Sequence, residues 1–213
     1  MRTAIKVCGI STPEALDAAI AAEADFAGLV FFPPSPRHVD TYAAAALAAH
    51  GGGKIGRVGL FVDADDGLLR DAIGAGRLDA VQLHGEETPD RVAQVKERFG
   101  LPVWKALPIA TDTDVQKANA YRGVADLLLF DAKTPKDAAL PGGMGLRFDW
   151  SLLSAWRGKT GWGLAGGLSP ANVAQAIAET GAPLVDTSSG VESAPGVKDV
   201  DKIAAFCKAA RQI

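Results

Sequence analysis

The sequence predicts an α/β protein folded as a single (β/α)8 TIM barrel over residues 1–213. Short apolar runs, typical of buried parallel strands, alternate with alanine-rich amphipathic segments, typical of helices that cover a sheet. The alternation repeats eight times within a length that α/β barrels commonly reach as one domain. No G-x-G-x-x-G turn follows the first expected strand, so a closed barrel is favoured over an open doubly wound sheet.

The first half of the chain supplies four strand-and-helix units. A β-branched run that ends at Cys8 opens the series, and the hydroxyl before proline at Thr12-Pro13 is a start signal for the next helix. The apolar stretch Phe26 to Phe32 predicts the second strand. The elements expected in this half are strands 3–8, 26–31, 55–62 and 79–84, and helices 12–22, 41–49, 65–75 and 88–99.

The second half continues the same pattern. The apolar run Leu127 to Phe130 predicts the sixth strand, and Ser169-Pro170 is a start signal for the seventh helix. The pattern is weakest in the helix near 112–121. The elements expected in this half are strands 102–107, 125–131, 161–165 and 183–187, and helices 112–121, 149–156, 170–180 and 200–211.

The charge balance indicates a small-molecule partner. Lys and Arg number 22 against 25 Asp and Glu, for a formal charge of -3, and no basic run stands out. Nucleic acid and membrane surfaces are therefore not expected as partners. The longest apolar stretches, Phe26 to Phe32 and Ala43 to Ala49, are far shorter than the roughly 20 residues of a membrane helix.

The two cysteines, Cys8 and Cys207, are too few for a disulfide framework, and the N-terminus lacks the pattern of a signal peptide. We therefore expect a soluble protein of the reducing cytoplasm. No His or Cys spacing indicates zinc and no P-loop is present, so neither a metal nor a nucleotide is expected. The oligomeric state is open between monomer and homodimer.

Cys8 lies where the first strand should give way to a loop. Side chains on a strand alternate, so Lys6 and Cys8 share one face. A thiol has a pKa of about 8.5, and a nearby positive charge lowers it and makes the thiolate more available as a base. The ordinary alternative for a lone cysteine is a small buried hydrophobic residue.

Asp131 ends the sixth strand after an apolar run. Capping of a following helix is the common role of such an aspartate, but the next residues contain two prolines and the cluster Gly142 to Gly145, so no helix should begin at once. In a barrel, catalytic groups sit at the carboxyl ends of the strands. Cys8 and Asp131 could therefore face one ligand across the mouth, as a general base and a general acid require.

Glycine-rich loops follow the seventh and eighth strands. Gly166 and Gly167 precede Leu168-Ser169-Pro170, and Asp186-Thr187 precede Ser188, Ser189 and Gly190. Barrels bind phosphate after these two strands, where glycines expose backbone N–H groups and hydroxyls add donors. Either loop alone could be turn chemistry, but their joint placement favours a phosphate site.

Three further residues are weaker candidates. Arg37, after the second strand, could offer a bidentate fork to a carboxylate, although a solvated surface arginine is the default. Gln82 and His84 share a face at the end of the fourth strand and would point into the mouth. A structural role for this histidine is about as well supported as a functional one.

Together these residues resemble the phosphoribosylanthranilate isomerase family of tryptophan biosynthesis, with motifs along the whole chain. The motifs are Lys6-Val7-Cys8-Gly9, Phe32 with Ser35-Pro36-Arg37, Gly59-Leu60-Phe61-Val62, Val81 to Glu86, Leu129-Phe130-Asp131, Phe148-Asp149-Trp150, Leu164 to Leu168, and Asp186 to Glu192. Each motif is weak alone, but their ordered set is specific. One departure is Met144, where the family usually has a small hydroxyl residue.

The resemblance implies an Amadori rearrangement of a phosphorylated aminoaldose, N-(5-phosphoribosyl)anthranilate, to 1-(o-carboxyphenylamino)-1-deoxyribulose 5-phosphate without a cofactor. It implies that Asp131 protonates the ribose ring oxygen and that Cys8 then removes the proton from C2. It also implies that Arg37 binds the anthranilate carboxylate, and that Asp186 contacts the sugar hydroxyls or Lys6. Other substrate atoms would be bound by Lys6, Gln82 and His84. The residues implied to bind the phosphate are Gly166, Gly167, Ser188 and Ser189.

Other functions remain open. The related histidine-pathway isomerase performs the same rearrangement on a carboxamide aminoaldose, but an aspartate would be expected in place of Cys8, and the same objection applies to a dual-substrate barrel. Epimerases and synthases of this barrel class would use a metal-binding histidine set or a lysine acid. A catalytically silent phosphate-binding barrel would need neither Cys8 nor Asp131.

Overall fold

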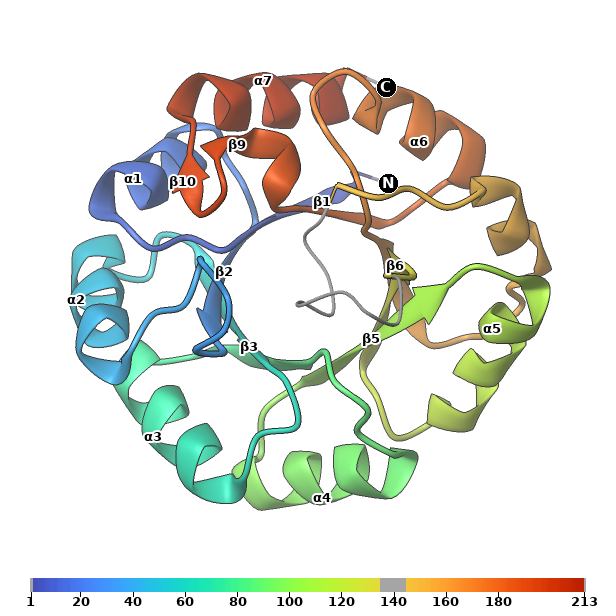
Figure 1. Ribbon diagram of the computed structural model, residues 1–213, viewed down its shortest axis with the longest axis horizontal. Helices are drawn as coiled ribbons and strands as arrows, with labels where there is room; N and C mark the ends of the chain where they lie inside the picture. The colour runs from blue at the N-terminus through green and yellow to red at the C-terminus, as the bar shows by residue number, and fades with distance from the viewer. Residues whose placement is uncertain (1, 135–144, 213) are drawn as a thin grey trace.

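The computed structural model describes residues 2–134 and 145–212. Eight parallel strands hydrogen-bond in chain order and close into a barrel, β1 pairing with both β2 and β8 (Figure 1). The strands are β1 (Ala4–Cys8), β2 (Phe26–Phe31), β3 (Gly56–Phe61), β4 (Ala80–Leu83), β5 (Val103–Ile109), β6 (Leu127–Ala132), β7 (Gly161–Leu164) and β8 (Leu184–Thr187). The predicted closed barrel is confirmed.

Helices surround the barrel in a ring (Figure 1). They are α1 (Pro13–Ala21), α2 (Thr41–Gly51), α3 (Asp66–Gly76), α4 (Pro89–Phe99), α5 (Asp112–Lys117), α6 (Val173–Thr180) and α7 (Val200–Arg211). The predicted proline start is confirmed for α1, where Thr12 accepts a hydrogen bond from the first-turn backbone. Helix α4, for which no start signal was predicted, begins in the same way, with Thr88 as its cap before Pro89. Within the described residues, no helix is long and apolar enough to cross a membrane.

Three predicted helices differ from the structure. The helix expected near 112–121 ends at Lys117 and continues as a 3-10 turn, η1 (Ala118–Tyr121). The segment after β6 forms a short 3-10 helix, η2 (Trp150–Ala155), whose first turn is capped by the Asp149 side chain, which accepts from the Ser151 N–H. The helix after β7 begins at Val173 and not at Pro170. Here the Asn172 side chain bonds to the Ser169 N–H and the Gly167 carbonyl, which extends the loop by a turn.

The lower interior of the barrel is filled with apolar side chains. Its members pack as one cluster of Val58, Ala80, Trp104, Ala106, Leu129 and Leu184. Trp104 meets Phe26 edge to face, with ring centroids 5.1 Å apart. This apolar layer fills the interior toward the amino ends of the strands, and the pocket described below opens at their carboxyl ends.

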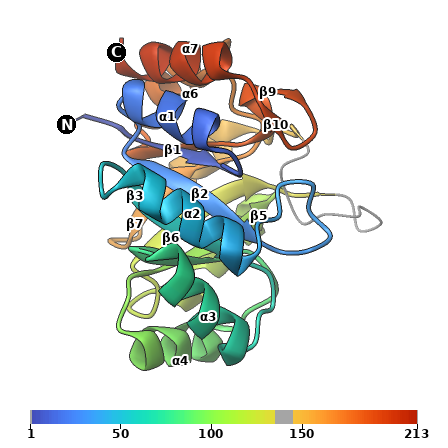
Figure 2. The same ribbon diagram turned by 90° about the vertical axis from the view of Figure 1, so that its left-hand side faces the viewer.

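A small hairpin that the sequence did not predict follows β8. It consists of η3 (Ser189–Val191), β9 (Glu192–Ala194) and β10 (Val197–Lys198), and β9 and β10 pair antiparallel. In Figure 1 the hairpin lies beside α1, and Figure 2 shows it on the side of the barrel opposite the two chain ends. The hairpin therefore adds side chains to the carboxyl-end face.

Candidate active site

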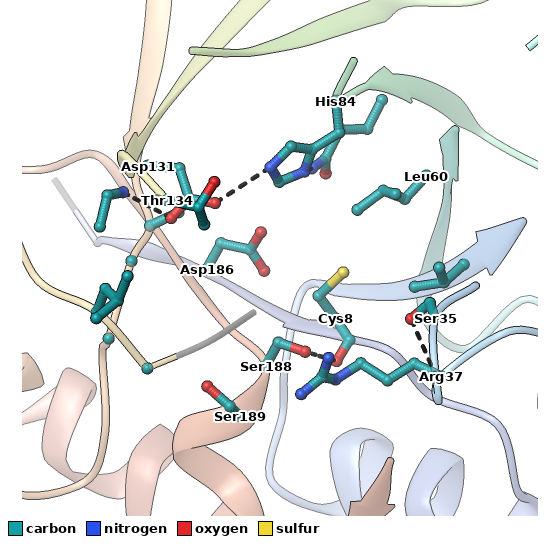
Figure 3. Close-up of a pocket in the computed structure, with 18 of the residues that line it drawn as sticks. Cys8, Ser35, Arg37, Leu60, His84, Asp131, Thr134, Asp186, Ser188 and Ser189 are labelled. Atoms are coloured by element: carbon teal, nitrogen blue, oxygen red, sulfur yellow. Dashed lines mark hydrogen bonds and ion pairs between the residues drawn. The ribbon is translucent and has the colours of Figure 1, made fainter. Parts of the chain in front are cut away.

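A pocket of about 790 Å³, partly open to solvent, lies at the carboxyl ends of the strands. Ten of the predicted site residues line it: Cys8, Arg37, Gln82, His84, Asp131, Gly166, Gly167, Asp186, Ser188 and Ser189. Lys6, the eleventh, is fully buried. The structure therefore brings together side chains from strands far apart in the sequence (Figure 3).

Cys8 ends β1 and is only 5% exposed. Its neighbour across the sheet is Gly28, where an added Cβ would lie 2.8 Å from the sulfur, so this glycine makes room for the thiol. Burial raises the pKa of Cys8 by more than Lys6 lowers it. The expected net lowering of this pKa by Lys6 is therefore wrong: desolvation outweighs the attraction of the cation.

Lys6 and Asp186 form a buried ion pair beneath the pocket. They are register partners on β1 and β8, and the Lys6 Nζ donates to Asp186 Oδ2 over 2.8 Å. Burial lowers the pKa of Lys6, but Asp186 and Cys8 together raise it above its ordinary value. The ion pair therefore favours the charged form of Lys6. Asp186 Oδ1 has no hydrogen-bond partner among the described residues.

Asp131 belongs to a chain of three polar side chains. Its Oδ1 accepts from the Ala132 N–H over 2.8 Å, and its Oδ2 lies 3.2 Å from His84 Nε2 (Figure 3). The Gln82 amide nitrogen lies 3.2 Å from His84 Nδ1. When Gln82 donates there, the imidazole proton sits on Nε2 and points at Asp131. Gln82 on β4 and His84 just after it therefore orient the predicted acid.

The loops after β7 and β8 bring backbone to the pocket wall. Gly166 and Gly167 have φ of +82° and +64°, and an added Cβ at Gly166 would lie 2.5 Å from the Ala132 nitrogen. The Ser188 hydroxyl donates to the Cys8 carbonyl over 3.1 Å. Since its one proton is used there, the donors that this loop can offer to a ligand are backbone N–H groups and the Ser189 hydroxyl.

Arg37 is held by a partner that the sequence did not predict. Its Nε and Nη2 donate to the two carboxylate oxygens of Glu192, over 2.7 and 2.8 Å. The guanidinium therefore already holds one carboxylate through one edge. Glu192 ends the last motif of the family resemblance, and that position was the only available signal. Met144, the one departure from the family pattern, lies outside the described residues, as do Gly142 and Gly143.

A closed barrel with a thiol, carboxylates and glycine-rich loops at the carboxyl ends of its strands defines a TIM-barrel enzyme. The family model for N-(5'-phosphoribosyl)anthranilate (PRA) isomerase matches residues 5–209. The chain belongs to this isomerase family.

Individual relatives agree with this assignment. The N-(5'-phosphoribosyl)anthranilate isomerase of Paramagnetospirillum magneticum is 54% identical over 211 residues, which cover 99% of this chain and 98% of the relative. The crystal structure of the Thermotoga maritima phosphoribosyl anthranilate isomerase is 35% identical, with a TM-score of 0.87 over 99% of this chain and 100% of that one. A further isomerase structure, 33% identical with a TM-score of 0.84 over 99% of this chain and 100% of that one, holds reduced 1-(o-carboxyphenylamino)-1-deoxyribulose 5-phosphate.

Proposed function

We propose that the chain converts N-(5-phosphoribosyl)anthranilate to 1-(o-carboxyphenylamino)-1-deoxyribulose 5-phosphate, in tryptophan biosynthesis, by general acid and base catalysis without a cofactor. The observation that carries the proposal is that Cys8 on β1 and Asp131 on β6 line one pocket. A related isomerase holds the reduced form of this product, which supports the same substrate class here.

Asp131 acts first, as the general acid. It delivers a proton to the ribose ring oxygen while the bond from C1 to that oxygen breaks and the anilino nitrogen lone pair forms a C=N bond. The Schiff base formed is cationic and Asp131 becomes a carboxylate. His84 then donates to Oδ2 and the Ala132 N–H to Oδ1, so both oxygens of the new anion are stabilised.

Cys8 acts second, as the general base. Its thiolate takes the proton from C2, the C–H electrons form a C1=C2 bond, and the C=N electrons return to nitrogen. The neutral enolamine then gains a proton at C1 and loses the hydroxyl proton at C2, which yields the ketone. The cationic Schiff base favours a nearby thiolate, and this attraction offsets the burial that raises the pKa of Cys8.

The ends of the substrate are held by the rest of the pocket. The phosphate lies against the backbone of Gly166-Gly167 and of Ser188-Ser189, where glycine permits close approach. Asp186 Oδ1 is available to a sugar hydroxyl, while Lys6 holds Oδ2. Burial raises the pKa of Asp186 by more than Lys6 lowers it. Arg37 receives the anthranilate carboxylate beside its existing partner Glu192.

The test is a fluorescence assay with two aminoaldose phosphates, one derived from anthranilate and one being the carboxamide of the histidine pathway. We expect turnover of the first only. Turnover of the carboxamide alone, or of neither compound by folded protein, would overturn the proposal. The second outcome would leave a silent phosphate-binding barrel.

A further inference from the structure

Three buried charged side chains form a cluster beside the hairpin: Arg37, which lines the pocket, and Glu192 and Lys198 behind it. Glu192 accepts from Arg37 Nε over 2.7 Å, from Arg37 Nη2 over 2.8 Å and from Lys198 Nζ over 2.7 Å. The side chains of Arg37, Glu192 and Lys198 are only 7%, 4% and 2% exposed. One carboxylate therefore holds two cations together where solvent screens little.

The hairpin places Glu192 rigidly. The Gly196 N–H donates to Glu192 Oε2 over 3.2 Å, and Lys202 Nζ donates to the Glu192 carbonyl over 2.7 Å. Gly196 has a φ of +82°, and an added Cβ there would collide with the Pro36 carbonyl. The turn between β9 and β10 thus packs directly on the residue before Arg37.

Glu192 determines which part of the guanidinium meets a ligand. A guanidinium can bind a carboxylate through either of two edges. The first edge is formed by Nε and Nη2, and the second by Nη1 and Nη2. Glu192 takes the first edge, so a ligand carboxylate must approach the second. Figure 3 shows this end of Arg37 directed toward Ser188, across the part of the pocket that Cys8 borders.

Lys198 ties the same cluster to the loop after β8. Its Nζ donates to the Ser188 carbonyl over 3.0 Å and lies 3.3 Å from the Ser188 hydroxyl. That hydroxyl donates in turn to the Cys8 carbonyl. The cluster therefore spans from Arg37 to the anion-binding loop and to the strand that carries the thiol.

We propose that Glu192 and Lys198 are positioning residues that set the selectivity of the pocket for a substrate with an aryl carboxylate. They fix Arg37 so that its outer edge meets that carboxylate at a set distance from the phosphate loop. The proposal rests on the proposed function, because it concerns the carboxylate end of that substrate. Neither residue touches the reacting atoms.

The experiment compares two substrates in three proteins. The substrates are N-(5-phosphoribosyl)anthranilate and N-(5-phosphoribosyl)aniline, which lacks the carboxylate, and the ratio of their kcat/KM values measures selectivity. The proteins are wild type, Glu192→Gln and the control Ser193→Ala, whose exposed side chain is next to Glu192 on β9. Glu192→Gln removes the charge that holds the Arg37 guanidinium. Because a hydrogen bond to a charged group stabilises a contact strongly, we expect the selectivity ratio to fall about 10- to 100-fold.

We expect that loss to appear as a higher KM for the anthranilate substrate, with unchanged kinetics for the aniline substrate and an unchanged ratio in Ser193→Ala. If Glu192→Gln does not fold, Glu192→Asp keeps the charge but shortens its reach, and the ratio should fall again. An equal loss on both substrates would indicate a merely structural role and overturn the inference. A wild type inactive on the anthranilate substrate would instead overturn the proposed function.

Discussion

The two halves of the barrel interior use opposite chemistry. Below, Leu129, Trp104 and their neighbours form an apolar layer in which dispersion and burial stabilise the fold. Above, the same strands end in Cys8, Asp131 and Asp186 around an open pocket. The same barrel strands contribute side chains to both layers. A substitution in the apolar layer should therefore lower stability, and a substitution at the pocket should lower activity.

The largest effects should come from the upper layer. Asp131→Asn fills similar space but cannot deliver a proton, and Cys8→Ser leaves a hydroxyl too weakly acidic to serve as a base near neutral pH. Positioned proton transfer typically accelerates a reaction about 10²–10⁴-fold. We therefore expect kcat to fall by at least about 100-fold, the lower end of this range, in each variant. Steady-state kinetics together with circular dichroism measure both the loss and the retained fold. Near-normal turnover in Cys8→Ser would return Cys8 to an ordinary buried residue.

In the lower layer, Leu129→Ala should cost stability and spare the chemistry. Leu129 is fully buried in the apolar cluster, and removing a buried leucine side chain costs about 2–5 kcal/mol. Denaturant unfolding measures this loss, while kcat well below the unfolding transition should stay near the wild-type value. A large fall in kcat with unchanged stability would contradict the division between the layers.

A substitution in the loop after β7, which is part of the proposed phosphate site, should change substrate binding and spare turnover. In Gly167→Leu, the added side chain meets the Leu146 carbonyl, 2.7 Å from the position of a Cβ, at a backbone φ of +64°. We expect a KM at least about 10-fold higher, because backbone approach to the phosphate is blocked while the acid and base are untouched. Gly181→Ala, also at positive φ but with open space around it, controls for backbone strain. A lower kcat with unchanged KM would remove this loop from the phosphate site.

The smallest effect concerns the ionisation of the free thiol. Because burial raises the pKa of Cys8 above that of a free thiol, about 8.5, the thiol form should persist through neutral pH, and the alkylation rate should reach half of its maximum at a higher pH than it does for a free cysteine. Cys207, whose pKa burial raises to about 11, is removed by Cys207→Ser so that only Cys8 reports. Iodoacetamide labelling followed by mass spectrometry gives the midpoint. A midpoint below that of a free cysteine would show that Lys6 dominates after all.

Local sequence sufficed for the parts of the molecule that depend on local pattern. The strand runs, the proline start of α1 and the placement of Cys8 and Asp131 at strand ends follow from local pattern and from the barrel rule. The start signal at Ser169-Pro170 was wrong, because the contacts of the Asn172 side chain delay α6 to Val173. Long-range contacts were out of reach. Arg37 and Glu192 are 155 residues apart in the chain, and no local pattern states that a hairpin brings them together. Likewise, the balance between burial and Lys6 at Cys8 depends on how deeply the folded chain buries the thiol.

The central claim is that Asp131 and Cys8 act in successive steps, and a deuterium isotope effect at C2 of the substrate tests it most directly. In Cys8→Ser, proton abstraction should limit turnover, so the C2-deuterated substrate should react more slowly by a clear primary effect. In Asp131→Asn, ring opening should limit turnover and the isotope effect should be close to one. A larger effect in Asp131→Asn than in Cys8→Ser would contradict the assignment of acid and base.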